Sequence, residues 1–114
     1  MIVRDLIQEL KGYVQSVPVE VQDIIDPHGP YCRIWGITHK VVGTDNVAIF
    51  YAVRRDVEDV LEISVAEVRE GLSQLYNSCF VVIEYGHLPD VLVHVRDICL
   101  VRNDIVISPF PDED

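Results

Sequence analysis

Histidine and cysteine are the side chains of this sequence most suited to binding a metal ion, and two His–Cys pairs lie close together in the chain. His28 precedes Cys32, and His94 precedes Cys99. We expect each cysteine to lie inside a β-strand, where four residues span roughly 13 Å, too far for two ligands of one zinc ion. We therefore predict that the chain binds no metal and no other cofactor, and that these histidines are turn or surface residues.

Two of the histidines occupy matching places in the sequence. His28 and His87 each stand two residues before a proline, in segments typical of turns. If the two turns are equivalent, this pair could hold a ligand or respond to pH, because histidine titrates near neutrality. The alternative is that both are exposed turn residues.

One pair of bases is adjacent in the sequence, at Arg54 and Arg55. Guanidinium groups bind phosphate and carboxylate well, so these arginines could hold an anionic ligand. They could equally pair with the acidic residues that follow them, at positions 56, 58 and 59.

The sequence carries no recognisable catalytic motif. It has no Gly-x-Ser-x-Gly element, and its glycines are scattered singly rather than gathered in a phosphate-binding loop. Asp23, Asp26 and Glu84 lie at the ends of expected strands, where solvated carboxylates are common. We therefore predict that the protein is not an enzyme.

A second group of residues could recognise a macromolecule. Tyr31, Arg33 and Trp35 alternate along one expected strand and so share one of its faces. Tyrosine, tryptophan and arginine dominate the energetics of protein interfaces, so an exposed face of this kind would be a recognition patch. The alternative is that Trp35 belongs to the core and Arg33 reaches to solvent from beneath it.

The charge of the chain limits its partners. The formal net charge is −10, and only two residues are lysines, Lys11 and Lys40. A phosphate backbone or an anionic membrane needs clustered bases, so we expect no direct nucleic-acid or membrane binding. The acidic C-terminal half, with Glu84, Asp90 and Asp97, would instead suit a basic protein partner, unless its charge serves only solubility.

The fold class follows from an internal repeat. Val3, Leu6 and Leu10 recur 62 positions later as Val65, Val68 and Leu72. Each copy reads as one helix followed by three strands, which predicts an α+β fold of two αβββ repeats with pseudo-two-fold symmetry. We expect an antiparallel sheet with two amphipathic helices packed on it, as one six-stranded sheet or two three-stranded sheets. The boundaries are repeat 1 at 1–53, a connector at 54–63, repeat 2 at 64–108 and an acidic tail at 109–114, within a single domain at 1–114.

Hydrophobic spacing places the individual elements. It predicts a helix over 3–15 and strands over 19–25, 31–42 and 47–53 in the first copy. In the second copy it predicts strands over 79–85, 91–101 and 105–108, after a helix that opens with a capping box between Ser64 and Glu67. Residues 54–62 fit either a short helix or an extended crossover.

The first part of the chain resembles a known group of proteins. The segment Val3-Arg4-Asp5-Leu6-Ile7-Gln8-Glu9-Leu10, followed by Pro18-Val19-Glu20-Val21, is similar to the start of many small uncharacterised phage and prophage α+β proteins. The resemblance covers about the first 50 residues, and the duplication departs from it. It implies a phage-type accessory protein and brings no activity or catalytic residue with it.

These observations lead to one expected function and two alternatives. We expect a small acidic protein that docks on another macromolecule, as an inhibitor or accessory factor that masks a basic, nucleic-acid-binding surface. The first alternative is a small-molecule or nucleotide-binding sponge that uses His28, His87 and the arginines, and the second is an oligomeric structural subunit. We expect a monomer or a homodimer in the cytoplasm, since no stretch reads as a signal peptide or a membrane span.

Overall fold

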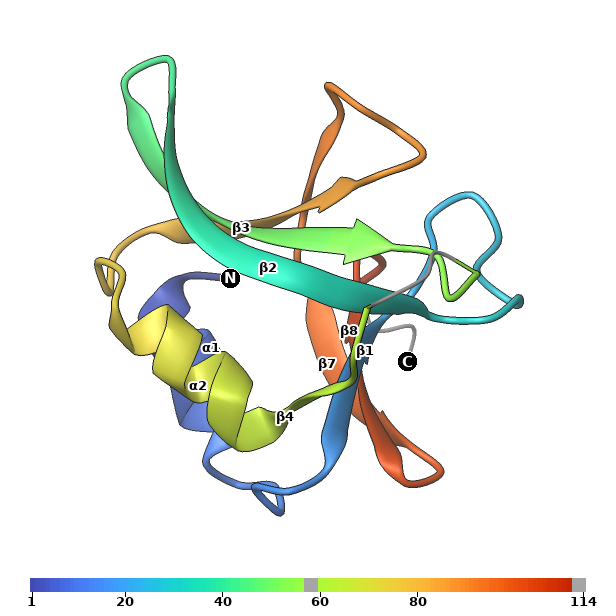
Figure 1. The fold of residues 1–114 in the computed structure, drawn as a ribbon. Coiled ribbons are helices and arrows are strands. Elements are labelled where there is room, and N and C mark those ends of the chain that lie inside the picture. Colours follow the sequence, from blue (N-terminus) through green and yellow to red (C-terminus); the bar gives the residue numbers. More distant parts are fainter. Residues whose placement is uncertain (57–59, 112–114) are drawn as a thin grey trace.

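The structure is a computed structural model that describes residues 1–56 and 60–111, and it combines two helices with eight strands (Figure 1). In chain order the elements are α1 (Val3–Leu10), β1 (Pro18–Val21), β2 (Cys32–Val42), β3 (Asp45–Val53), β4 (Ile63–Ser64), α2 (Val65–Ser73), β5 (Phe80–Tyr85), β6 (Leu92–His94), β7 (Asp97–Val101) and β8 (Asp104–Ser108). The expected α+β class is confirmed. The two helices lie side by side against the sheet.

All strands belong to one curled sheet with the order β6-β5-β3-β2-β1-β8-β7, to which β4 adds by pairing with β1. The expectation of an antiparallel sheet is wrong in two places, because β1 runs parallel to β8 and β3 runs parallel to β5. Parallel neighbours need a long connection between them, and the chain from β3 to β5 provides one that contains α2. The sheet is therefore mixed and larger than the six strands expected.

The first helix is shorter than its apolar spacing suggests. Its buried stripe is Val3, Leu6 and Leu10, but it ends at Leu10 instead of continuing to residue 15. Gly12 follows directly, and glycine is a poor helix former. The Gln15 amide then donates to the carbonyl oxygens of Leu10, at 3.2 Å, and Tyr13, at 2.7 Å. This side chain therefore satisfies carbonyl oxygens that would accept from backbone N–H groups if the helix continued.

The second helix begins as the sequence predicts. The Ser64 hydroxyl accepts from the backbone N–H of Glu67 at 3.2 Å, and the Glu67 carboxylate accepts from the backbone N–H of Ser64 at 3.3 Å. This confirms the capping box, which satisfies two backbone donors at the helix start.

Two expected strands are interrupted. The strand predicted over 19–25 ends at Val21, because the Asp23 carboxylate accepts from the N–H of Ile25 at 3.0 Å and turns the chain. The strand predicted over 91–101 bends at Val95 and Arg96, which separate β6 from β7. The N–H of Val95 bonds to Val81 on β5 and that of Arg96 to Ser108 on β8, so the bend carries the chain from one end of the sheet to the other.

In the segment between the two predicted repeats, the described residues 54–56 and 60–62 form neither a helix nor a strand. The two-residue strand β4 follows them. The choice between a helix and a crossover at 57–59 lies outside the described residues, as do the last three residues of the expected acidic tail, 112–114.

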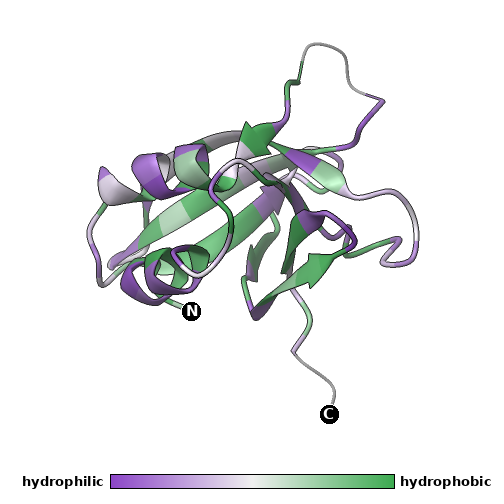
Figure 2. Cartoon of the chain, turned by 90° about the horizontal axis from the view of Figure 1, so that it is seen from below, coloured by the Kyte–Doolittle hydropathy of each residue, from purple (hydrophilic) through white to green (hydrophobic). Residues whose placement is uncertain are grey.

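The apolar residues form two clusters. The larger lies between the sheet and the helices and includes Leu6, Phe50 and Leu72, whereas Val47, Ile49 and Val82 form a smaller one. In Figure 2 the strands between the helices are mostly apolar, and each helix alternates between polar and apolar residues along its turns. Within the described part of the chain, neither helix is long and apolar enough to cross a membrane.

Candidate functional site

The smaller apolar cluster marks the sheet face turned away from the larger core. Alternation along β3 points Ala48, Phe50 and Ala52 into the larger core, so the intervening residues Val47, Ile49 and Tyr51 point the other way. Val82 on β5 and Leu92 complete this second cluster. The cluster therefore forms the floor of a second apolar surface on the sheet.

Trp35 lies at the edge of this surface and is exposed. The pairing of β2 with β3 shifts register between Ile34 and Gly36, so Trp35 is an extra residue in β2 with no partner of its own. Its side chain is 69% exposed, and its ring packs edge-on against Tyr51 with 6.3 Å between ring centroids. The structure thus places Trp35 at the surface, which was one of the two alternatives for this residue.

A groove of about 340 Å³ opens beside Trp35, and we call it the Trp35 groove. It is lined by Trp35, Tyr51, Ala52, Val53, Glu84, Tyr85, Gly86, Pro89 and Asp90. Three of the six residues expected to bind a partner, Trp35, Glu84 and Asp90, are therefore brought together. Asp90 adopts a left-handed backbone conformation, with φ of 69°, which aspartate tolerates better than most residues.

The other three expected binding residues lie elsewhere. The Arg33 guanidinium donates from Nη1 to the carbonyl oxygen of Val60 at 2.9 Å, so it secures the segment before β4. Tyr31 lies before the start of β2 and lines a separate cleft, and Asp97 pairs with Ser108 at the start of β7. The shared face expected for Tyr31, Arg33 and Trp35 is broken by the register shift at Trp35.

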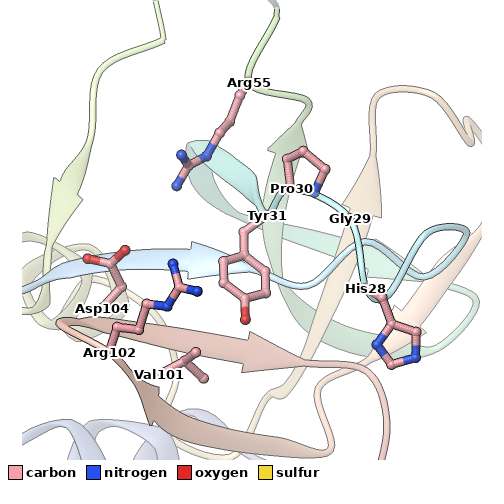
Figure 3. Close-up of a pocket in the computed structure, with 8 residues that line it drawn as sticks. All are labelled: His28, Gly29, Pro30, Tyr31, Arg55, Val101, Arg102 and Asp104. Atoms are coloured by element: carbon pink, nitrogen blue, oxygen red, sulfur yellow. The ribbon is translucent and has the colours of Figure 1, made fainter.

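A second opening, the Arg102 cleft, lies near the turn between β7 and β8 and has a volume of about 400 Å³. It is lined by His28, Gly29, Pro30, Tyr31, Arg55, Val101, Arg102 and Asp104 (Figure 3). Two ligand candidates from the sequence, His28 and Arg55, therefore meet here. Figure 3 shows Tyr31 between Arg102 and His28, with the Arg102 guanidinium pointing toward the tyrosine ring.

Arg55 is anchored to a buried carboxylate that sequence reasoning missed. Its guanidinium forms an ion pair with Glu20, which is only 1% exposed. Burial and the neighbouring Asp104 carboxyl raise the pKa of Glu20, although Arg55 opposes both effects. Glu20 lies in β1 between β2 and β8, and only the pairing of β1 with these two strands brings it together with Arg55 and Asp104.

The remaining ligand candidates, His87 and Arg54, converge on another buried acid. Asp23 is 4% exposed, its Oδ1 lies 3.0 Å from His87 Nε2, and its Oδ2 lies 3.4 Å from Arg54 Nε. Burial alone would raise the pKa of Asp23, but the hydrogen bonds from Ile25 N–H and His87, with the nearby charges of His87 and Arg54, lower it overall. The two histidines therefore occupy different surroundings, His87 in a polar cluster and His28 at the Arg102 cleft.

Cys32 and Tyr85, which interact electrostatically with the buried acid Asp23, both have raised pKa values. Burial raises the pKa of the Cys32 thiol to about 12 and also raises that of the Tyr85 phenol, whose hydroxyl donates to the Gln22 carbonyl oxygen at 2.6 Å. A protonated thiol is a poor nucleophile. Over residues 1–56 and 60–111, no three His, Cys, Asp or Glu side chains gather as a metal site would require.

Comparison with protein-family profiles, curated proteins and solved structures gave no match for this chain.

Proposed function

We propose that this chain is a non-enzymatic acidic binding protein that docks on another protein through the Trp35 groove. The observation that carries the proposal is Trp35 itself, a large apolar side chain that is 69% exposed beside two carboxylates, Glu84 and Asp90. Interface hot spots are enriched in tryptophan and tyrosine, and the groove contains both.

The chemistry of the groove favours a basic side chain as its occupant. A guanidinium can lie over the face of an indole ring and at the same time donate to a carboxylate. The groove offers the indole of Trp35 and the carboxylates of Glu84 and Asp90, with Tyr51 as apolar wall. We infer that an arginine of the partner enters between them.

The charge of the whole chain supports the same kind of partner. A net charge of −10 attracts a basic surface from a distance and speeds encounter at low salt. A nucleic-acid-binding surface is basic, so masking such a surface fits this charge. The resemblance to phage-type proteins adds the proposal of an inhibitory or accessory role in a host cytoplasm.

We further infer that the chain is two αβββ repeats related by a pseudo-two-fold axis. The support lies in the pairing of the strands. The strand after α1, β1, is parallel to β8, and the strand after α2, β5, is parallel to β3. The first strand of each repeat thus pairs with the last strand of the other, with the bent pair β6 and β7 standing where β2 stands in the first repeat.

Tryptophan fluorescence provides the test, because Trp35 is the only tryptophan in the chain. We expect an arginine-rich peptide to change the fluorescence of Trp35 at low salt, and the binding to weaken as salt screens the carboxylates. Replacing both groove acids, with Glu84→Gln and Asp90→Asn, should weaken binding about fivefold.

The control is Asp97→Asn, which removes one carboxylate charge outside the groove. It should leave the affinity nearly unchanged. A peptide that binds without altering Trp35 fluorescence, or an equal loss of affinity in the control, would contradict the proposal, since either result would mean that general acidity and not the groove is recognised.

A further inference from the structure

The turn between β7 and β8 holds an arginine in a conformation that usually belongs to glycine. Arg102 has a φ of 57°, in the left-handed region that is strained for most side chains. It is the first residue of a two-residue turn, because Val101 pairs with Asp104. Turns with positive φ at this position favour glycine, asparagine or aspartate.

The turn between β2 and β3 shows which residue type suits the same geometry. There Val42 pairs with Asp45 around another two-residue turn, and its first residue is Gly43, with φ of 64°. Arg102 therefore occupies a glycine position. Strained residues of this kind gather at ligand sites, where the side chain is needed.

The Arg102 side chain reaches into the Arg102 cleft. Figure 3 shows its guanidinium directed at Tyr31, in a cleft of about 400 Å³ that Arg55 also lines. Among the described residues the Arg102 side chain has no hydrogen-bond or ion-pair partner. The same holds for the Tyr31 hydroxyl and the His28 ring. The cleft thus gathers hydrogen-bond donors that no described protein group uses.

The two arginines of the cleft differ in their ion pairing. Arg55 is paired with Glu20, and the Asp104 carboxyl interacts with that same Glu20–Arg55 pair. These three groups interact with one another, whereas the Arg102 guanidinium forms no ion pair within residues 1–56 and 60–111. The neighbouring cavity at Arg54 differs, since Asp23, Asp26 and Asp56 line it together with the two adjacent arginines.

From these observations we infer that the Arg102 cleft binds a small phosphate monoester of about mononucleotide size. The Arg102 guanidinium would take two phosphate oxygens, as guanidinium forks do, and Tyr31 and His28 would donate to the rest of the ligand. Pro30, Val101 and the ring of Tyr31 supply apolar surface for a sugar or base, and the volume of about 400 Å³ lies in the range of small-molecule pockets.

Isothermal titration calorimetry with adenosine 5′-monophosphate, adenosine and inorganic phosphate as probes tests this inference. We expect the monophosphate to bind best, and adenosine to bind at least tenfold more weakly because it lacks the charge-assisted bonds. Equal affinity for adenosine and its monophosphate would overturn the inference, as would the lack of any heat of binding with the monophosphate at millimolar concentration.

The variant Arg102→Gly separates the ligand role from a structural one. The variant has the same residue type in this turn as in the β2–β3 turn, so the melting temperature of the variant should equal or exceed that of the parent protein. Its affinity for the monophosphate should fall at least tenfold. Arg102→Lys keeps the charge and loses the forked guanidinium, so its affinity should lie between that of the parent protein and that of Arg102→Gly. Arg4→Gln, an exposed arginine outside the cleft, is the control and should bind like the parent.

Unchanged affinity in Arg102→Gly would show that Arg102 does not hold the phosphate. A drop in melting temperature of that variant, together with unchanged affinity, would instead assign Arg102 to the fold. Either result would overturn the inference.

Discussion

The carboxylate of Asp23 and the imidazole of His87 lie 3.0 Å apart although 64 residues separate them in the sequence. Asp23 follows β1 and His87 follows β5, so this contact joins the two predicted repeats. Arg54 closes the cluster from a third segment. Buried polar clusters of this kind stabilise a fold only while every member keeps its partner.

We therefore expect Asp23→Asn to lower the free energy of unfolding at pH 7 by roughly 1.5–3 kcal/mol, the range for hydrogen bonds to charged groups. The folded state lowers the pKa of Asp23, so its contribution is complete above the unfolded-state pKa and disappears as pH falls through the folded-state value. Urea unfolding of the parent protein and of Asp23→Asn from pH 3 to pH 8 should show that their difference in unfolding free energy becomes smaller at acidic pH. A difference that is constant with pH would contradict the ionic interactions of Asp23.

Glu20 should show the opposite pH dependence. Its folded-state pKa is raised, so the stabilisation that its proton brings is present below the unfolded-state pKa and is lost as pH rises through the folded-state value. Glu20→Gln cannot lose this proton. The stability of the variant relative to the parent protein should therefore increase with pH, as measured by the same urea series, and a relative stability that decreases with pH would be inconsistent with this carboxyl environment.

Substitutions in the second apolar cluster and at the exposed Trp35 beside it should have clearly different effects on the free energy of unfolding. Ile49 is fully buried, so Ile49→Ala should cost roughly 2–5 kcal/mol through lost burial and the cavity left behind. Trp35→Ala removes a mostly exposed side chain, and we expect a change within about 0.5 kcal/mol. Chemical denaturation followed by far-UV circular dichroism measures both, and a large loss in Trp35→Ala would assign Trp35 to the fold instead of to binding.

The capping box of α2 gives a local test. Ser64→Ala removes the hydroxyl that accepts from Glu67 N–H, which should cost about 1 kcal/mol. Ser73→Ala, at the exposed end of the same helix, removes a hydroxyl that bonds only to the Glu70 carbonyl oxygen and should cost less. Thermal denaturation of the two variants compares them, and equal losses would argue against the cap.

The parts of the fold that the sequence predicts are those set by near neighbours. The stripe of Val65, Val68 and Leu72 and the Ser64 cap depend on spacings of three or four residues, so periodicity is enough to find α2. The predicted start of the first helix is confirmed, but its end depends on Gly12 and on the side chain of Gln15.

The parts that could not be predicted depend on distant segments. Parallel pairing of β1 with β8 joins residues 19–21 to residues 105–107, and no local pattern encodes it. Glu20 reads as a solvent-facing position in an alternating strand, yet it is buried and forms an ion pair with Arg55. For the site, residue types were enough to single out Trp35, Glu84 and Asp90, but the register shift that separates Tyr31 and Arg33 from Trp35 appears only in the pairing.

The bend at Val95 and Arg96 has a consequence for how the protein behaves at high concentration. β6 and β7 stand at the two ends of the strand order, yet they are consecutive in the chain. The free backbone at each end is limited to strands of three and five residues that turn away from one another at the bend. Short, diverging edges are poor templates for an incoming strand, so these two ends of the strand order oppose fibril growth even though the chain is rich in valine and isoleucine.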